Sequence, residues 1–462
     1  MSSSKAIVLA AGKGTRMKSE LPKVLHKVYD RCIIDYVCNA CEDAGINDIC
    51  IIVGHKAQQV KDHVEKFRPN VKFCLQEEQL GTGHAVMQAK DYIDDDDMIF
   101  VINGDQPLVS SLTIKSMISF CEQGNYGGAA LTAIVDCPGS LGRIIRDSNG
   151  NLERIVEKKD CNEEEEKVKE VNIGVYCFKG SLLKSTFNKL DDNNAQNEYY
   201  ITDIPYHIKE QGFPFGVFAI SDLSEYQGIN SREELSLATC TLLNKMRKLH
   251  MINGVTLIDP NNTYISIDAK IGKDTIIYPG TNIQGETIIG ENCIIGPNSH
   301  IISSKIGNNV IIETSKVEGS IIENDSKIGP FANLRQNSNI GMNCKVGSFV
   351  ETKKVSVGNN TKIPHHIYVG DAEIGNNVEI ACGAITANMN ANWQKNKTII
   401  KDGAFIGSNS TLLAPVTIGE NSLVAAGSVI TDSVPDISLA IARTRQTTKD
   451  GYAKNDKYTK KR

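Results

Sequence analysis

The second half of the chain places an aliphatic residue at every sixth position, and this period restricts the fold more than any other feature. The spacing is strict in the series Ile328, Leu334, Ile340, Val346 and in the series Ile406, Leu412, Ile418, Val424, Ile430. A period of six fits neither an α-helix nor an alternating strand, but it is typical of a parallel β-helix. Each aliphatic side chain then points into a triangular core, while Gly, Asn and Ser take the corners that need positive φ. Because every coil is covered by its neighbours, the repeats from about residue 265 predict a solenoid domain.

One segment leaves this period. Between Ile385 and Ile399 the stretch TANMNANWQKNK breaks the phase and contains Trp393, the single tryptophan of the chain. A loop that leaves a solenoid is a common binding element, so we expect this loop to contact a substrate.

The first half has a different texture, in which short apolar runs alternate with helical patterns. The runs AIVLAAG, ICIIVG, MIFVING and GAALTAIV predict an α/β domain with a mostly parallel sheet up to about residue 228. Ligands of such sheets bind beyond the carboxyl ends of the strands. The acidic runs DDDD (94–97) and EEEE (163–166) are expected to be solvated loops.

A single long helix is expected to connect the two halves. Ser231 and Glu234 stand at the spacing of a capping box, and Gly254 follows as a stop. Between them an apolar stripe recurs at the helical period, at Leu235, Ala238, Leu242, Met246 and Leu249. The predicted domains are residues 1–228, a helical linker over 229–253, and a repeat domain over 254–462.

The composition excludes several classes of protein. The 462 residues carry a formal net charge of −5, which argues against a nucleic-acid binder that relies on bulk positive charge. No apolar run reaches the roughly 20 residues that span a bilayer, and the start MSSSKAIVLAAG lacks a signal-peptide pattern. The 13 cysteines are scattered, and we expect Cys38 and Cys41, which form one C-x-x-C in a helical pattern, to be buried thiols. The sequence therefore predicts a cytoplasmic protein without a membrane span.

The stretch VLAAGKGTRMKSELPKV, which includes the end of the first apolar run, predicts a phosphate site. It is not a Walker loop, because a lysine stands between its glycines, and the dinucleotide fingerprint G-x-G-x-x-G fails at Met17. Gly12 and Gly14 still let backbone N–H groups approach an anion. Arg16 and Lys23 add positive charge for its oxygens.

Together with LQEEQLGTGHA, NGDQPL, NAQNEYYITD and the hexads, this stretch resembles the sugar-1-phosphate nucleotidyltransferases. Nearly from end to end, the chain resembles the bifunctional N-acetylglucosamine-1-phosphate uridyltransferase / glucosamine-1-phosphate N-acetyltransferase family. The resemblance implies a Rossmann-like nucleotidyltransferase domain, a connecting helix and a left-handed parallel β-helix. It also implies synthesis of UDP-N-acetylglucosamine, a precursor of bacterial cell-wall sugars, by acetyl transfer in the second domain and then uridylyl transfer in the first. The co-substrates would be acetyl-CoA and UTP, the metal Mg²⁺, and the assembly a homotrimer.

The resemblance carries the first site of the family over to matching residues. The nucleotide with its phosphates, the uracil and the N-acetylglucosamine group would be bound by Leu9, Ala10, Ala11, Gly12, Arg16, Lys23, Gln76, Gly81, Thr82, Gly142, Glu157, Asn172 and Asn230. Asp105 and Asn230 would hold Mg²⁺, an ion that prefers oxygen ligands. The sequence departs from the family at Asn103, where a Tyr is frequent.

The second site is implied in the same way. His365 would take a proton from the amine of glucosamine-1-phosphate, since histidine titrates near neutral pH. The glucosamine-1-phosphate would be bound by Arg335, Lys353, Tyr368, Glu379 and Asn388. The acetyl-CoA would be bound by Cys382, Ser408, Ala426 and Arg443. Glu379 stands where Asn is common, and NMNA replaces NYDG, which puts Met389 in place of a Tyr.

Three alternatives are weighed against this interpretation. Zinc at His365 and its neighbour His366 is disfavoured, because successive residues of a strand point to opposite sides. A nucleotidyltransferase whose β-helix only trimerises or regulates it is disfavoured by His365 and by the loop at Trp393. A non-catalytic assembly subunit is disfavoured by the complete set of Gly12, Gly14, Arg16, Lys23, Asp105 and Asn230.

Overall fold

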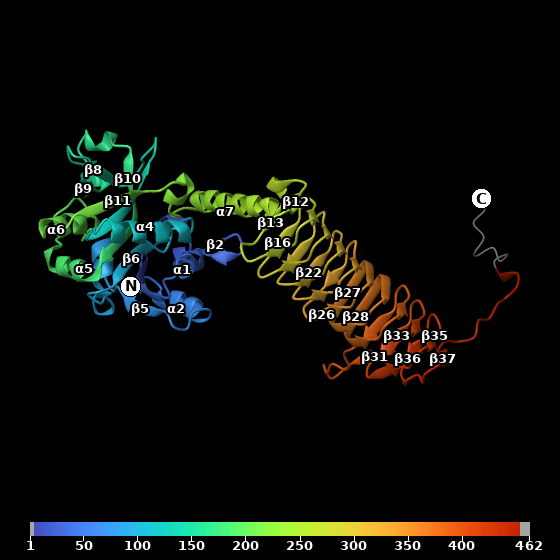
Figure 1. Ribbon diagram of the computed structural model, residues 1–462. Coiled ribbons are helices and arrows are strands. Elements are labelled where there is room, and N and C mark those ends of the chain that lie inside the picture. Colours follow the sequence, from blue (N-terminus) through green and yellow to red (C-terminus); the bar gives the residue numbers. More distant parts are fainter. Residues whose placement is uncertain (1–3, 453–462) are drawn as a thin grey trace. The chain divides into compact units, whose positions relative to one another are not determined.

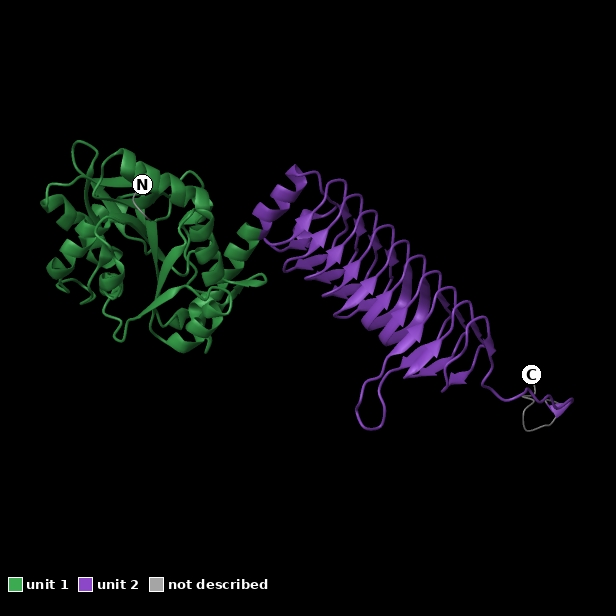
Figure 2. Ribbon diagram, turned by 60° about the horizontal axis from the view of Figure 1, so that its bottom comes forward, with its two compact units in different colours: residues 1–242 green, residues 243–462 purple. Residues whose placement is uncertain are grey.

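The computed structural model describes residues 4–452, and the chain falls into two compact units, residues 1–242 and 243–462 (Figures 1 and 2). The basic stretch KNDKYTKKR at 454–462, for which the sequence predicts disorder, lies outside the described residues. Across the described part of the chain, no helix is long and apolar enough to cross a membrane.

The first unit is built on a mixed sheet that contains the four predicted runs. Its order is β11-β7-β10-β6-β1-β4-β5, from β1 (Ser4–Ala10), β4 (Asp48–Val53), β5 (Lys72–Leu75), β6 (Met98–Asn103), β7 (Gly128–Ile134), β10 (Glu170–Lys179) and β11 (Phe215–Ala219). Strand β1 is parallel to its neighbours β4 and β6, whereas β10 runs antiparallel between β6 and β7. A hairpin of β8 (Arg143–Arg146) and β9 (Leu152–Val156) extends from β10. The parallel part of the sheet therefore carries the glycine turn that follows β1.

Helices cover both faces of this sheet. The apolar side chains of β1 point alternately to the two faces, so each face needs a covering layer. Ala6 and Val8 pack with α1, α2 and α4, whereas Ile7 packs with α3, α5 and α6. The bounds are α1 (Ile33–Asp43), α2 (Ala57–Glu65), α3 (Thr82–Met87), α4 (Ser111–Gln123), α5 (Gly180–Thr186) and α6 (Ile204–Glu210). Cys38 and Cys41 are fully buried thiols of α1, which confirms that prediction.

The expectation that the acidic runs are solvated loops is wrong for part of each run. Asp97 is buried and its carboxylate lies 2.7 Å from Nζ of Lys5. Glu165 is also buried and accepts hydrogen bonds from Arg154 at 2.7 Å and from the backbone N–H of Asn162 at 2.8 Å. A carboxylate can be buried where a cation or N–H donors pair with it. The acidic run in the sequence does not show which residues these partners are.

Helix α7 (Arg232–Ile252) is the predicted connecting helix. The backbone N–H of Glu234 donates to Oγ of Ser231 at 3.2 Å, and the Glu234 carboxylate accepts from the backbone N–H of Ser231 at 3.0 Å. This reciprocal pair confirms the capping box. Gly254, which follows the helix, has a φ of +89° and confirms the predicted stop.

The apolar stripe of α7 is confirmed only in its first half. Ala238 is buried, but Leu249 is 48% exposed, and the second half buries Leu243, Arg247 and His250 instead. Nε of Arg247 donates to the carbonyl of Thr263 at 2.7 Å, so this part of the helix turns a mixed polar face toward the first coil of the second unit. A single helical period cannot describe a helix whose two halves pack against different cores.

The second unit is a parallel β-helix of short strands from β12 (Thr256–Leu257) to β37 (Leu439–Ala440), with the longer β27 (Lys345–Val357) and β28 (Lys362–Ile374) in its middle. Through most of the solenoid each strand pairs in parallel with the third strand along, which gives three strands per coil. The nine aliphatic residues of the two predicted series are all buried. Asn292, Asn309, Asn343, Asn360 and Asn377 occupy corners with positive φ, as predicted.

The predicted interruption is a loop that protrudes from the solenoid (Figure 2). It closes with an antiparallel bridge between Met389 and Lys395, and Trp393 at its end is 83% exposed.

Candidate active sites

A cleft of about 280 Å³ opens beyond the carboxyl ends of β1, β5 and β6. This is the place that the sheet topology predicts for a ligand. It brings together nine residues of the predicted first site, namely Leu9, Ala10, Ala11, Gly12, Lys23, Gln76, Gly81, Thr82 and Asp105. Arg16 lies in an exposed turn after Gly14 and does not line this cleft.

The glycine turn has a structural requirement at one position. Gly14 has a φ of +60°, and a Cβ built there would lie 2.8 Å from Cβ of Lys23. Glycine therefore lets the turn at Lys23–Leu25 pack closely on the turn after β1. A Cβ on Gly12 would meet no atom within 4 Å, so Gly12 presents its backbone to the cleft.

Lys23 joins the two predicted metal ligands. Its ammonium group pairs with the Asp105 carboxylate and donates to Oδ1 of Asn230 at 3.0 Å. The backbone N–H of Ile229 also donates to the carbonyl of Asp105 at 2.9 Å, which fixes the segment before α7 against the end of β6. A carboxylate and an amide oxygen that share the Lys23 ammonium lie close enough together to share a metal ion, and Mg²⁺ prefers oxygen ligands of this kind. These residues fit the implied ion.

The predicted uracil contacts lie where the segment at Gly81 and Thr82 packs against the segment at Tyr199 and Ile201. Gln76 is buried, and its amide nitrogen donates to the carbonyl of Gly81 at 3.1 Å, which leaves its amide oxygen as an acceptor for a base. Gly81 has a φ of +112°, and a Cβ there would lie 2.5 Å from the carbonyl oxygen of Tyr199. The hydroxyl of Thr82 accepts from the backbone N–H of Ile201 at 3.2 Å.

The predicted sugar contacts also come together. The backbone N–H of Asn172 donates to the carbonyl of Gly142 at 2.9 Å, and a Cβ built on Gly142 would lie 3.6 Å from Oε2 of Glu157. Burial raises the pKa of Glu157, although Thr202 donates to its carboxylate at 3.4 Å. Inside the core, the hydroxyl of Tyr176 accepts from the Asn172 amide at 2.7 Å. The amide of Asn172 is therefore held in one orientation.

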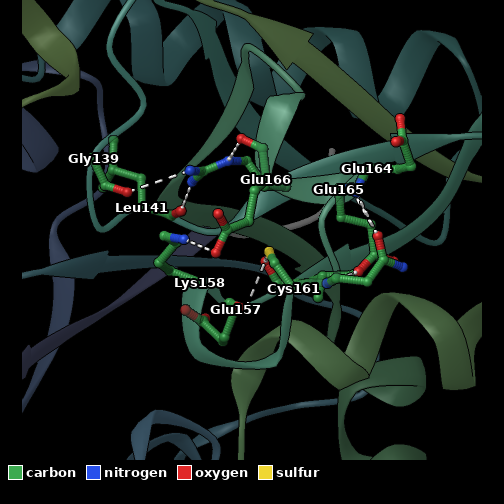
Figure 3. Close-up of polar contacts among 11 residues, drawn as sticks. Gly139, Leu141, Glu157, Lys158, Cys161, Glu164, Glu165 and Glu166 are labelled. Atoms are coloured by element: carbon green, nitrogen blue, oxygen red, sulfur yellow. Dashed lines mark hydrogen bonds and ion pairs between the residues drawn. The ribbon is translucent and has the colours of Figure 1, made fainter.

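Figure 3 shows the loop that backs Glu157. Lys158 bonds to Glu166, and the Cys161 thiol donates to the carbonyl of Glu157 at 3.4 Å. The buried guanidinium of Arg143 donates to the backbone carbonyls of Gly139, Leu141 and Glu166. The acidic run thus supports the backbone that carries Glu157.

Sequence reasoning missed part of the lining of the first cleft. Gln79, Asn103 and Glu198 line it as well. Asn103, noted above as a departure from the family, donates through Nδ2 to the carbonyl of Gly174 at 3.2 Å. Glu198 belongs to the motif NAQNEYYITD, which marked the segment without identifying the residue that reaches the cleft.

In the second unit, the predicted base and the predicted acetyl-CoA contacts share one corner of the solenoid. The strand registers align His365 with Cys382, then Ser408, then Ala426, one residue per coil. Arg443 follows on the next coil, where its Cδ lies 3.8 Å from a Cβ built on Gly427. The four predicted contacts therefore form a line that begins at His365.

Most of the predicted sugar-phosphate contacts lie on the neighbouring face. Asn388 lies at the foot of the loop, its Nδ2 2.5 Å from Asp371, and a Cβ on Gly370 would meet both Asn388 and the hydroxyl of Tyr368. The register aligns Lys353 with Gly370.

Cations gather on this face. The positive charges of Lys395 and Arg335 lower the pKa of Lys353. Lys395, which belongs to the protruding loop, was not predicted. A cluster of three cations suits a phosphate.

Glu379 is not brought to that face. It pairs in register with Lys362 and Phe405, three residues before the corner at Cys382, and its side chain is exposed. Within one chain, Glu379 and the Lys353 cluster occupy different faces of the solenoid.

Comparisons with known proteins cover both units. Residues 5–219 match the family described as nucleotidyl transferase, and residues 268–303 and 397–432 match the bacterial transferase hexapeptide family. A protein of Clostridioides difficile (strain 630) described as bifunctional protein GlmU is 46% identical over 98% of each chain. The chain belongs to the GlmU family. GlmU proteins of Alkaliphilus oremlandii and Clostridium kluyveri are 46% and 47% identical over 99% and 97% of each chain. Both units of the chain thus have counterparts in the GlmU family.

Proposed function

We propose that this GlmU family member makes UDP-N-acetylglucosamine in two steps. The second unit transfers an acetyl group from acetyl-CoA to glucosamine-1-phosphate, and the first unit then transfers uridylyl from UTP to the product and releases pyrophosphate. The full-length match to bifunctional relatives carries this proposal, because it spans both units. A nucleotidyltransferase with a purely structural β-helix is not favoured.

The first reaction site needs no nucleophile from the protein. An oxygen of the sugar phosphate attacks the α-phosphorus of UTP in line, and the bond to pyrophosphate breaks. Lys23 and the backbone N–H groups at Gly12 position the phosphates, and Arg16 adds charge at the rim. Gln76 offers its amide oxygen to uracil, while Glu157 and Asn172 hold the sugar. Asp105 and Asn230 would hold Mg²⁺, which would supply positive charge to the phosphate oxygens.

The second reaction needs a base. His365 accepts a proton from the sugar ammonium, the free amine attacks the thioester carbonyl, and the CoA thiol leaves. Arg335, Lys353 and Lys395 balance the charge of the sugar phosphate. The donor lies along the corner lined by Cys382, Ser408 and Ala426.

The position of Glu379 supports assembly with another copy of the chain, and the hexapeptide repeats favour a homotrimer. Within its own chain, Glu379 faces away from the Lys353 cluster. Glu379 of a second copy of the chain can reach that cluster and complete the sugar site. We place the enzyme in the cytoplasm, where UTP and acetyl-CoA are available, with no nucleic-acid or membrane partner.

A coupled assay with glucosamine-1-phosphate, acetyl-CoA, UTP and Mg²⁺ tests the proposal on the wild type and on His365→Ala. The wild type should release both CoA and pyrophosphate. The variant should lose CoA release but still use N-acetylglucosamine-1-phosphate. His366→Ala is the matched control, because the neighbouring imidazole stacks on Phe349 and has no assigned role in the reaction. Normal acetylation by His365→Ala would remove the base assignment, and the absence of CoA release by the wild type would leave only the uridylyltransferase.

A further inference from the structure

Outside both sites, three side chains of the types that bind metals converge in the first unit. Cys32 ends β3 (Arg31–Cys32) and precedes α1, Asp35 lies in the first turn of α1, and His63 lies in the last turn of α2. One ligand atom from each lies within 4.8 Å of the other two. Among residues 4–452, this is the one group of three or more Cys, His, Asp or Glu side chains that meets this distance.

The donor atoms are held by contacts around them. Nε2 of His63 lies 2.9 Å from Oδ2 of Asp35, and Arg68 donates to the other oxygen, Oδ1, at 3.2 Å. Arg68 also bonds to Glu42 at 2.8 Å, so its charge is shared by a second carboxylate. The carboxylate of Asp35 is thereby oriented with Oδ2 toward His63. Outer contacts of this kind fix metal ligands in known sites.

The three side chains can also be reached from solvent. Cys32 and Asp35 are buried, whereas the side chain of His63 is 24% exposed and offers a path from solvent. The Cys32 thiol donates to the carbonyl of Leu25 at 3.2 Å, and burial raises its pKa to about 11. A soft divalent cation would displace the thiol proton and bind the thiolate.

We propose that Cys32, Asp35 and His63 form a site for a thiophilic divalent cation of the zinc class, with water in the fourth position. A thiolate, an imidazole and a carboxylate are typical ligands of Zn²⁺, whereas Mg²⁺ selects oxygen ligands. The ion would connect the start of α1 to the end of α2, where the side chains of Asp35 and His63 already meet. The site is independent of both transfer reactions.

The competing explanation is a purely structural network in which His63 and Arg68 share Asp35. The two explanations differ at Cys32, because no hydrogen bond joins its thiol to His63 or Asp35 among the described residues. Replacement of the thiol therefore abolishes a metal site and leaves that network intact.

Cobalt(II) tests the proposal, because a cobalt–thiolate bond gives a near-ultraviolet charge-transfer band and tetrahedral cobalt gives visible bands. The reduced full-length protein is titrated with Co²⁺ in excess Mg²⁺, which occupies oxygen sites. The wild type should bind one Co²⁺ per chain with both sets of bands, and Zn²⁺ should displace it. Cys32→Ser should lose the charge-transfer band, and His63→Gln should weaken binding at least tenfold.

Cys74→Ser is the matched control. Cys74 is half-buried, and its sulfur lies 3.4 Å from that of Cys50, so this pair is one alternative source of a thiolate band. The control should bind cobalt like the wild type. Absence of the band from the wild type, or its persistence in Cys32→Ser, overturns the proposal. If Cys32→Ser fails to fold by circular dichroism, unchanged cobalt binding by His63→Gln overturns it equally. Neither enzyme assay enters this test, so its failure would leave the two-step reaction intact.

Discussion

Replacement of Lys23 by Ala should slow uridylyl transfer strongly and destabilise the first unit modestly. The side chains of Lys23 and Asp105 are each 16% exposed, and Asn230 is the third partner. Removal of the ammonium leaves a carboxylate that is mostly buried and unpaired. Such a loss lies between the 0–1 kcal/mol of surface pairs and the 3–5 kcal/mol of broken buried pairs, so we expect about 2 kcal/mol. For a domain of this size, that lowers Tm by roughly 4–8 °C.

The kinetic effect should be larger than the effect on stability. Loss of one positioned donor at developing charge costs about 10²–10³ in kcat, so pyrophosphate release with N-acetylglucosamine-1-phosphate should fall by that factor. Acetyl transfer in the same chain should not change, and Lys27→Ala, at an exposed lysine near the same turn, is the charge-matched control. Mg²⁺ should raise the Tm of Lys23→Ala more than that of the wild type, because Asp105 regains a cation. Uridylyl transfer within about threefold of the wild type would refute the reasoning.

Three further outcomes follow from single contacts. Gly81→Ala forces a Cβ against the carbonyl of Tyr199 at positive φ, which should strain the loop by about 1–3 kcal/mol and raise KM for UTP; an unchanged KM would contradict it. Burial lowers the pKa of His26, whose Nδ1 accepts from Arg232 at 3.1 Å, so the first unit should lose stability as pH falls below ~6.5, and His26→Gln should reduce this slope in melting curves. Leu334→Ala removes a fully buried side chain and should cost the solenoid about 2–5 kcal/mol by denaturant unfolding; a cost below 1 kcal/mol would argue against a close-packed core.

The sequence predicts the solenoid well, because each coil needs the same buried aliphatic residues and the same small residues at its corners. The corners at Phe331, Phe349 and His366 are the exception, since bulky residues rarely adopt positive φ. Their rings stack, with centroids 5.2 Å and 5.0 Å apart along successive coils. That stacking depends on residues about 17 positions apart, which no local pattern reveals.

The sequence predicts those residues of the first cleft that lie in short motifs next to strand ends. The glycine turn directly follows β1 and Asp105 follows β6, so their meeting at one edge of the sheet could be expected, and Lys23 follows the glycine turn in the same motif. Glu198 reaches the cleft only because its segment bonds to the loop at Gly81, and Lys395 reaches Lys353 only because the protruding loop turns back. Glu165 is buried because Arg154 meets it. Such contacts depend on tertiary structure.

The line of residues from His365 to Ala426 has a consequence for how the solenoid can change. Neighbouring strands are about 4.8 Å apart, so three steps along this corner measure roughly 14 Å. In the proposed acetyl transfer, the number of coils therefore sets the length of corner along which the acyl donor lies. Gain or loss of one coil between these positions would shift one end of the donor against the imidazole by a whole strand spacing, whereas an insertion in a protruding loop would leave that length unchanged.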